Sequence, residues 1–291
     1  GSFTFPCHLA VATNWALAPV SPPTHSTSPR CQALGYEPCF HDHRDQSTVL
    51  GGLVLTRGIT NSNFYFMLDI LLVIERNFSL RDDHGGTVPR DSQPLHPGNY
   101  AIVTDGTLAL IDEAPLLRTT TSRTPGTRTK VFTEQVRQRD QRCVITKTEN
   151  PDARFGIWTS FEAAHIFPLA FEGYWIAQNF ARWITLPPTR GGTINSVQNG
   201  LLLRSDMHQR FNTYSISINP NDNYKVVCFQ SDIVGVAGTF LDRRLLDDER
   251  RPVDELLRWH FRQAILTNMR GAGEPIFEHD FPPRLRRYGG Y

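Results

Sequence analysis

Short apolar runs and helical periods alternate in the second half of the chain. A stripe of apolar positions predicts a helix over residues 131–140. Three apolar runs then predict buried strands at residues 142–146, 158–166 and 200–203. A helix is expected directly after the last of these strands, because Ser205 is a good N-cap residue. This succession of strand, loop, strand and helix is the most regular local unit of the sequence.

Two further elements are predicted downstream of this unit. Residues 215–218 and 224–229 flank a turn rich in Asn, Pro and Asp, which predicts a hairpin with one buried face. Residues 253–269 have apolar positions at helical spacing and predict an amphipathic helix that ends at Gly271. His260 falls within the apolar face of this helix, where we expect a core histidine with its hydrogen bonds satisfied.

The first half of the chain has weaker patterns. Residues 49–56 predict a strand, and residues 63–76 are apolar on nearly all sides, which fits either a buried helix or two strands. Two β-rich runs, at 100–104 and 107–111, flank an Asp-Gly pair and predict a hairpin with a two-residue turn. The polar, turn-rich stretch at 118–129 predicts either a linker or an ordinary surface loop.

Composition adds few constraints on function. The 291 residues contain 30 Lys and Arg against 29 Asp and Glu, so any surface for nucleic acid must be a local basic patch. The five cysteines include no Cys-x-x-Cys pair, which argues against a disulfide framework and against a structural zinc held by four cysteines. Cys31 and Cys39 remain a candidate pair if the chain is secreted.

The chain has no predicted membrane segment. Its longest apolar run, residues 64–74, contains Asp69 and is too short to cross a bilayer. Residues 7–20 are mildly apolar but lack the basic start of a signal peptide. We therefore expect an intracellular protein, nuclear or cytoplasmic, that does not bind membranes.

Three polar residues stand at special places in the strand–loop–strand–helix unit. His165 ends the strand predicted at 158–166, Asn199 precedes the next strand, and His208 lies in the first turn of the helix. A neutral histidine works as a general base near pH 7, and a second histidine offers a nitrogen ligand to a divalent ion. The positive end of the helix also favours a phosphate. Phosphodiester hydrolysis needs a base and a cation of this kind, so the three residues are compatible with that reaction.

The ordered triplet resembles the signature of the HNH endonucleases, in particular the fungal and bacterial subgroup without zinc cysteines. The similar region runs from about residue 132 to 270 and includes Glu162-Ala163-Ala164-His165-Ile166, Asn199, Leu201-Leu202-Leu203 and His208. The resemblance implies an α+β fold with a ββα-metal core and a β-rich N-terminal region. We expect the division to fall between a region of unknown role, residues 1–127, and a nuclease-like domain, residues 128–291.

The resemblance also implies an activity, a metal-dependent endonuclease that hydrolyses DNA phosphodiester bonds. His165 would be the general base and His208 a metal ligand. Asn199 would either hold the catalytic loop in shape or touch the metal. The ion would be Mg²⁺ or Mn²⁺, with most of its ligands supplied by water and phosphate oxygen. The oligomeric state is not implied.

One position departs from the pattern of many relatives. They place a metal-ligating Asp directly before the first His, where this chain has Ala164. Glu162, on the same strand face, and Asn212, one helical turn beyond His208, are candidate replacement ligands. The alternative is a domain derived from an HNH nuclease that no longer cuts nucleic acid, and that binds a partner or has been recruited for small-molecule chemistry.

Other candidate residues surround the triplet. Arg190, Arg204 and Arg210 are candidate phosphate contacts, with a solvated basic face as the alternative. The aromatic-rich stretch 171–183 lines either a pocket or a core. His41-Asp42-His43 has donors for a metal, but a solvated loop is the preferred interpretation because no partner cluster is evident.

Overall fold

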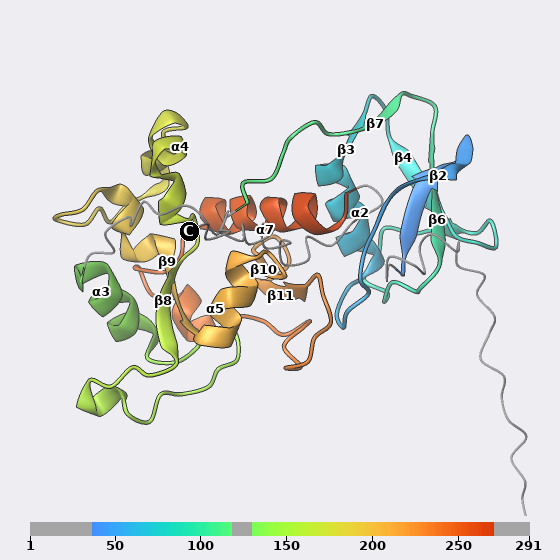
Figure 1. Ribbon diagram of the computed structural model, residues 1–291. Helices are drawn as coiled ribbons and strands as arrows, with labels where there is room; N and C mark the ends of the chain where they lie inside the picture. Colours follow the sequence, from blue (N-terminus) through green and yellow to red (C-terminus); the bar gives the residue numbers. More distant parts are fainter. Residues whose placement is uncertain (1–36, 118–129, 271–291) are drawn as a thin grey trace, which may run out of the picture.

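A mixed sheet forms the centre of the N-terminal region in the computed structural model, which describes residues 37–117 and 130–270 (Figure 1). Its five strands lie in the order β2-β1-β6-β4-β5, with β1 and β6 parallel and the other pairs antiparallel. The strands are β1 (Cys39–Asp42), β2 (Asp45–Gly52), β4 (Phe78–Arg81), β5 (Thr87–Val88) and β6 (Asn99–Thr104). The buried side of helix α2 (Asn61–Leu71) packs in the same core as this sheet.

The expectation of a hairpin over residues 100–111 is wrong. Both strands exist, but β6 pairs with β1 and β4, whereas β7 (Leu108–Leu110) pairs with β3 (Leu72–Ile74). The Asp-Gly pair therefore joins two strands that belong to different sheets. The apolar stretch 63–76, which fitted a helix or strands, contains both, because α2 continues directly into β3. The His41-Asp42-His43 segment lies largely on strand β1 and not in a loop.

The second region contains the predicted strand–loop–strand–helix unit. Its main elements are α3 (Lys130–Asp140), β8 (Phe161–His165), β9 (Gly200–Arg204), α5 (Ser205–Asn212), β10 (Ile216–Asn219), β11 (Lys225–Cys228) and α7 (Asp254–Asn268). Short helices fill the connections: η1 (Ala153–Phe155), η2 (Leu169–Phe171), α4 (Glu172–Ala177), η3 (Phe180–Trp183), η4 (Thr193–Asn195), η5 (Val197–Asn199) and α6 (Arg243–Leu246).

Two expectations for this region need correction. Residues 143–145 are buried, but the stretch 142–146 forms a tight turn and not a strand, since the amide of Lys147 donates to the carbonyl of Cys143. The β10–β11 hairpin exists, but both of its faces are buried, because all four residues of each strand are covered. Gly271, expected to end α7, and the stretch 118–129 lie outside the described residues.

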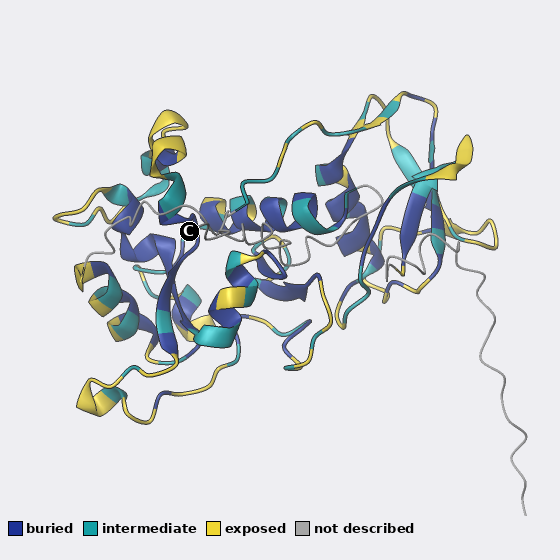
Figure 2. Cartoon of the chain, viewed as in Figure 1, coloured by how far each residue is buried: buried dark blue, intermediate teal, exposed yellow. Residues whose placement is uncertain are grey.

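Helix α7 connects the two regions of the molecule. Leu256 and Leu257 belong to the core of the second region, whereas Phe261 and Ile265 pack in the core of the N-terminal region. Figures 1 and 2 show α7 running between the two regions with most of its length buried. The division at residues 127 and 128 stays a prediction, and α7 contributes side chains to the cores on both sides of it.

The structure also describes three of the cysteines and allows the helices to be compared with membrane-spanning ones. Cys39 forms a disulfide, while Cys143 and Cys228 are free and buried. None of the helices within residues 37–117 and 130–270 has the length and apolar character that a bilayer crossing requires.

Candidate functional site

The β8–β9 hairpin positions the three residues of the triplet. His165 ends β8, Asn199 directly precedes β9, and His208 lies in α5, which follows β9. The strands pair antiparallel and without a bulge, with His165 opposite Gly200 and Glu162 opposite Leu203. Residues opposite each other point to the same face, so His165 shares a face with Gly200. A Cβ on Gly200 would lie 2.5 Å from Cγ2 of Val136, which shows that helix α3 covers this face. Glu162, an odd number of residues away, points to the other face, against α5.

His165 is held in a tight environment on the α3 face. The residue is 3% exposed, and its ring stacks on Phe132 with centroids 3.9 Å apart and an interplanar angle of 13°. Its Nε2 atom lies 3.2 Å from Oδ1 of Asn195, in the short helix η4. The stacking partner and the amide together fix the plane and the rotation of the imidazole.

Asn199 joins the segment that follows His165 to the segment that carries Asn195. Its Oδ1 accepts from the amide of Phe167 at 2.8 Å, and its Nδ2 donates to the carbonyls of Phe167 and Ile194 at 3.2 and 2.8 Å. The residue is fully buried. Both amide hydrogens are thus committed to backbone, which favours the loop-shaping role for Asn199 over the metal-ligand role.

A second cluster lies at the other end of the hairpin, between β8 and α5. Glu162 Oε2 is 2.5 Å from Nδ1 of His208, and its Oε1 accepts from the hydroxyl of Ser205 at 2.8 Å. The side chain of Glu162 is 44% exposed, whereas that of His208 is 7% exposed. Ser205 was expected to cap α5, but Arg204 is the N-cap residue and Ser205 instead orients the carboxylate.

The donor set of this cluster is compatible with a divalent ion that keeps most of its water. A carboxylate oxygen and an imidazole nitrogen are both suitable ligands, and Mg²⁺ is commonly held by one or two protein groups together with substrate phosphates. Within the described part of the chain, no three His, Cys, Asp or Glu side chains converge on one point. Asn212 is half-buried on α5, and Ala164 is fully buried.

The three residues therefore belong to two separate hydrogen-bonded groups, one at each end of the β8–β9 hairpin. Asn199 and His165 share the loop at the end of β8, and His208 and Glu162 lie where β8 begins. Three strand residues separate Glu162 from His165, which is about 10 Å along a strand. The side chains of His165 and Glu162 also point to opposite faces of the hairpin, toward α3 and α5 respectively.

The three candidate phosphate-binding arginines differ in their surroundings. Arg204 forms a two-pronged ion pair with Asp206, and Arg210 donates to the carbonyl of Ser231. Arg190 is exposed in the loop before η4. Of the three arginines, Arg190 is therefore the one that is most readily available to a phosphate.

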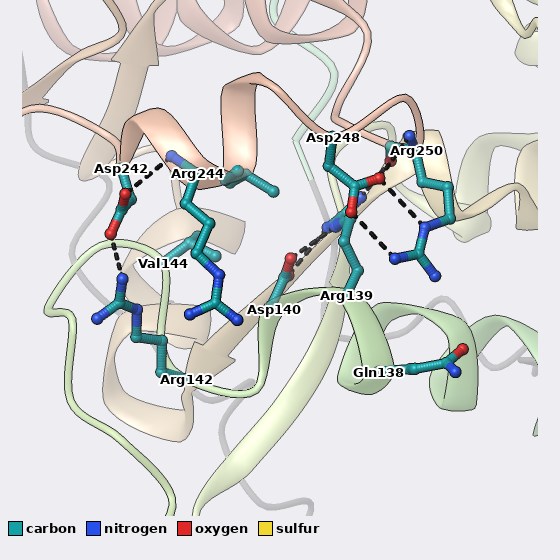
Figure 3. Close-up of a pocket in the computed structure, with 10 residues that line it drawn as sticks. Gln138, Arg139, Asp140, Arg142, Val144, Asp242, Arg244, Asp248 and Arg250 are labelled. Carbon is teal, nitrogen blue, oxygen red and sulfur yellow. Dashed lines mark hydrogen bonds and ion pairs between the residues drawn. The ribbon is translucent and has the colours of Figure 1, made fainter.

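A separate cavity of about 170 Å³ lies beside the outer edge of β9 and is rich in arginine (Figure 3). Figure 3 shows Arg142 reaching Asp242 and Arg250 reaching Asp248, so these charges are matched. The buried Arg139–Asp140 pair holds the strand edge instead: Arg139 donates to the carbonyl of Gly200, and Asp140 accepts from the amide of Leu202. Most of the charges that line the cavity are therefore paired, and Arg244 is the lining arginine whose guanidinium has no ion pair among the described residues.

Comparison with known proteins identifies the region that contains both clusters. Residues 143–219 match the family model described as HNH endonuclease. This region is an HNH endonuclease domain. Residues 35–109 match a family described as a domain of unknown function (DUF8573). No curated protein and no solved structure matches the chain.

The match spans every residue of the triplet and both clusters of the HNH domain. It does not include Phe132, which lies on α3 before the matched residues and stacks on His165. Sequence reasoning missed Phe132 and Asn195 as partners of His165, because neither stands next to a motif residue. The aromatic stretch 171–183 proves to be mainly core, since Trp175 and Phe180 are buried.

Proposed function

We propose that the protein is a metal-dependent endonuclease that hydrolyses DNA phosphodiester bonds, and that β8, β9 and α5 form its ββα-metal core. The family match at residues 143–219 carries this proposal, because it contains His165, Asn199 and His208 in order. The hydrogen bonds of Asn195 and Glu162 to the two histidines support it, since each fixes one imidazole in place.

His165 is the general base in this proposal. It removes a proton from a water molecule, the water oxygen bonds to phosphorus, and the bond from phosphorus to the 3′ oxygen breaks. The leaving oxygen takes a proton from solvent. Positioned acid–base groups of this kind contribute about 10²- to 10⁴-fold in rate.

His208 and Glu162 would hold the ion, as Mg²⁺ or Mn²⁺. Its contribution when bound is to neutralise charge on the phosphate and on the leaving oxygen. The Glu162 carboxylate accepts from Nδ1 of His208 in the structure, and an ion held by both side chains would replace this hydrogen bond and its proton. Ser205 fixes the other carboxylate oxygen.

The DNA backbone would be bound close to the same hairpin. The N-terminus of α5 presents backbone amides and a partial positive charge, which suits a phosphate. Arg190, Arg204 and Arg210 are the proposed phosphate contacts, with Arg204 and Arg210 exchanging their present partners for the substrate.

Plasmid nicking tests the proposal. We expect wild-type protein to nick supercoiled DNA with Mg²⁺ or Mn²⁺, EDTA to stop the reaction, and His165→Ala to lower the rate at least about 100-fold. His96→Ala is the matched control, because this histidine is exposed in the N-terminal region. Nicking that His165→Ala leaves unchanged would remove His165 from the role of base.

The burial of both histidines favours a second candidate function. His165 and His208 are 3% and 5% exposed, so a substrate must displace part of their cover to reach them. An HNH-derived domain that binds a partner or a small molecule would not need this opening. Absence of DNA affinity at low salt, together with absence of nicking in every metal, would support it, whereas salt-sensitive DNA binding would contradict it.

A further inference from the structure

Asn195 has a buried side-chain amide with one defined orientation. It is 3% exposed and lies in η4, whose backbone is fixed by the bond from the amide of Asn195 to the carbonyl of Gly192. Its Nδ2 donates to the carbonyl of Gly191 at 2.5 Å. A carbonyl only accepts hydrogen bonds, so the nitrogen of the side chain must face Gly191 and the oxygen must face His165.

This orientation determines where the proton of His165 resides. Oδ1 of Asn195 is also an obligate acceptor, and it lies 3.2 Å from Nε2 of the imidazole. Nε2 therefore carries a hydrogen. In the neutral ring the lone pair is then on Nδ1, which is the atom able to accept a proton.

Phe132 and Asn199 complete the support. Phe132 stacks on the ring and sets its plane, while Asn195 sets its rotation within that plane. Asn199 binds Phe167, two residues after His165, and Ile194, the residue before Asn195. The Asn of the triplet thus clamps together the segment that carries the histidine and the segment that carries its amide partner.

We propose that Asn195 is a positioning residue for His165, holding its neutral ring in the Nε2-protonated tautomer, which leaves Nδ1 as the nitrogen that takes up the proton. This assignment deepens the proposed nuclease function and rests on it for its catalytic meaning. Asn195 touches the base and not the substrate, so its loss should reduce kcat more than it changes KM.

Few charges compete with Asn195 around the ring. The segment from Thr193 to Asn199 contains no charged residue, and β9 has none before Arg204. On the α3 side, Arg139 donates to the carbonyl of Gly200, opposite His165, and Asp140 balances its charge. Arg190, near Gly191, is exposed, and the carboxylate of Glu172 lies against Gly192, three residues before Asn195. A charge introduced at Asn195 should therefore dominate the change in the pKa of His165.

The test uses Asn195→Asp and Asn195→Ala in the full chain, with Asn223→Asp as the matched control in an exposed turn. Asn195→Asp keeps an acceptor for Nε2 and adds a negative charge, so we expect the rising limb of the pH–kcat profile to move to higher pH. Asn195→Ala removes the acceptor and should lower kcat about 10- to 100-fold with little change in KM. Unshifted profiles and a wild-type kcat in the Ala variant would overturn the proposal.

Nitrogen NMR of the His165 ring separates this proposal from the nuclease proposal, because it needs no activity. We expect wild-type protein to show a protonated Nε2 and an unprotonated Nδ1 in the neutral ring. Asn195→Asp should raise the pKa of the ring, and Asn223→Asp should not. The opposite tautomer in wild-type protein, or a pKa unchanged by Asn195→Asp, would overturn the positioning role whether or not the protein cuts DNA.

Discussion

At the scale of single residues, buried polar side chains hold the loop around His165. Asn199 alone satisfies three backbone groups that would otherwise be buried without partners. A buried donor or acceptor left unsatisfied costs about 1–3 kcal/mol, and such costs accumulate within one network. The shape of this loop therefore depends strongly on one amide.

Replacing Asn199 should test this dependence directly. We expect Asn199→Ala to lower the free energy of unfolding by about 2–4 kcal/mol, because it leaves the amide of Phe167 and the carbonyl of Ile194 unbonded. Urea unfolding followed by circular dichroism measures the change. An exposed substitution, Asn77→Ala, is the control; equal effects of the two substitutions would show that Asn199 does not hold the loop.

His260 makes the stability of the fold sensitive to acid. Its ring is buried against Phe211, with Nδ1 accepting from the hydroxyl of Ser217 at 2.7 Å and Nε2 donating to the carbonyl of Phe211 at 3.0 Å. Burial lowers its pKa to about 3. In the unfolded chain a histidine has a pKa of about 6.5, so below this pH the unfolded state gains a proton that the folded state resists.

Stability should therefore be fully present above pH 6.5 and fall as the pH drops toward 3, with His260 contributing a loss of about 1.4 kcal/mol per pH unit. His260→Gln retains a donor and an acceptor but does not titrate, and should flatten the curve in this range. Urea midpoints measured from pH 8 to pH 4 provide the test. Parallel curves for the two proteins would contradict a buried neutral His260.

The sequence was sufficient to select His165, Asn199 and His208 as residues of interest and to place His260 in a core. It was not sufficient to find Asn195 or Phe132. Both partners lie far from His165 in the chain, and Asn and Phe residues are common in loops and cores. Their role depends on the path of the loops between β8 and β9, which no local pattern specifies.

At the scale of elements, the contact between α3 and the β8–β9 hairpin positions the His165 ring. Gly200 permits this contact, because a Cβ there would lie 2.5 Å from Val136 and 2.7 Å from Phe132. The close approach of α3 to β9 in turn places Phe132 against the imidazole. Gly200 therefore affects the position of the His165 ring indirectly, through the placement of α3.

Gly200→Ala should push α3 away from the hairpin. We expect a loss of about 1–3 kcal/mol in the free energy of unfolding, typical of overpacking, and a disturbed His165 ring signal. Gly173→Ala, in α4, is the matched control, because no atom lies within 4 Å of the added Cβ and alanine favours a helix. Thermal melting compares the two; a destabilised Gly173→Ala with an unaffected Gly200→Ala would contradict this account.

Helices and buried strands with clear periods were predictable, as α3, β9 and α7 show. The pairing of strands was harder to predict than the strands themselves. The Asp-Gly pair after β6 favoured a hairpin by local turn chemistry, but β6 instead pairs with β1 and β4 in the central sheet. Residues 142–146 similarly have the composition of a strand, yet one amide of this turn bonds to Leu202 of β9. In both cases long-range pairing outweighs the local preference.

At the scale of the whole molecule, α7 makes the HNH domain depend on the N-terminal region. Phe261, Ala264, Ile265, Leu266 and Met269 pack among the side chains of that region. The ion pair of Arg262 with Glu113 and the bond from Tyr214 to the carbonyl of Leu116 cross between the same two parts. Removing the N-terminal region would expose this apolar side of α7 to water.

A fragment of residues 130–270 should therefore be less stable than the full chain. We expect the full chain to unfold in one cooperative transition, and the fragment to melt at lower temperature and bind the dye ANS, because the C-terminal half of α7 is uncovered. Calorimetry and dye fluorescence measure both properties. A fragment that melts like the full chain and binds no dye would show that the regions are independent.

The central claim is that the β8–β9–α5 unit of the HNH domain cuts DNA with His165 as the base. The most direct measurement is the rate of plasmid nicking by wild-type, His165→Ala and His96→Ala proteins with Mg²⁺, with Mn²⁺ and with EDTA. We predict nicking by wild-type and His96→Ala in either metal, its loss in EDTA, and a rate at least about 100-fold lower for His165→Ala. Equal nicking by all three proteins, or none by any of them in any metal, would contradict the account.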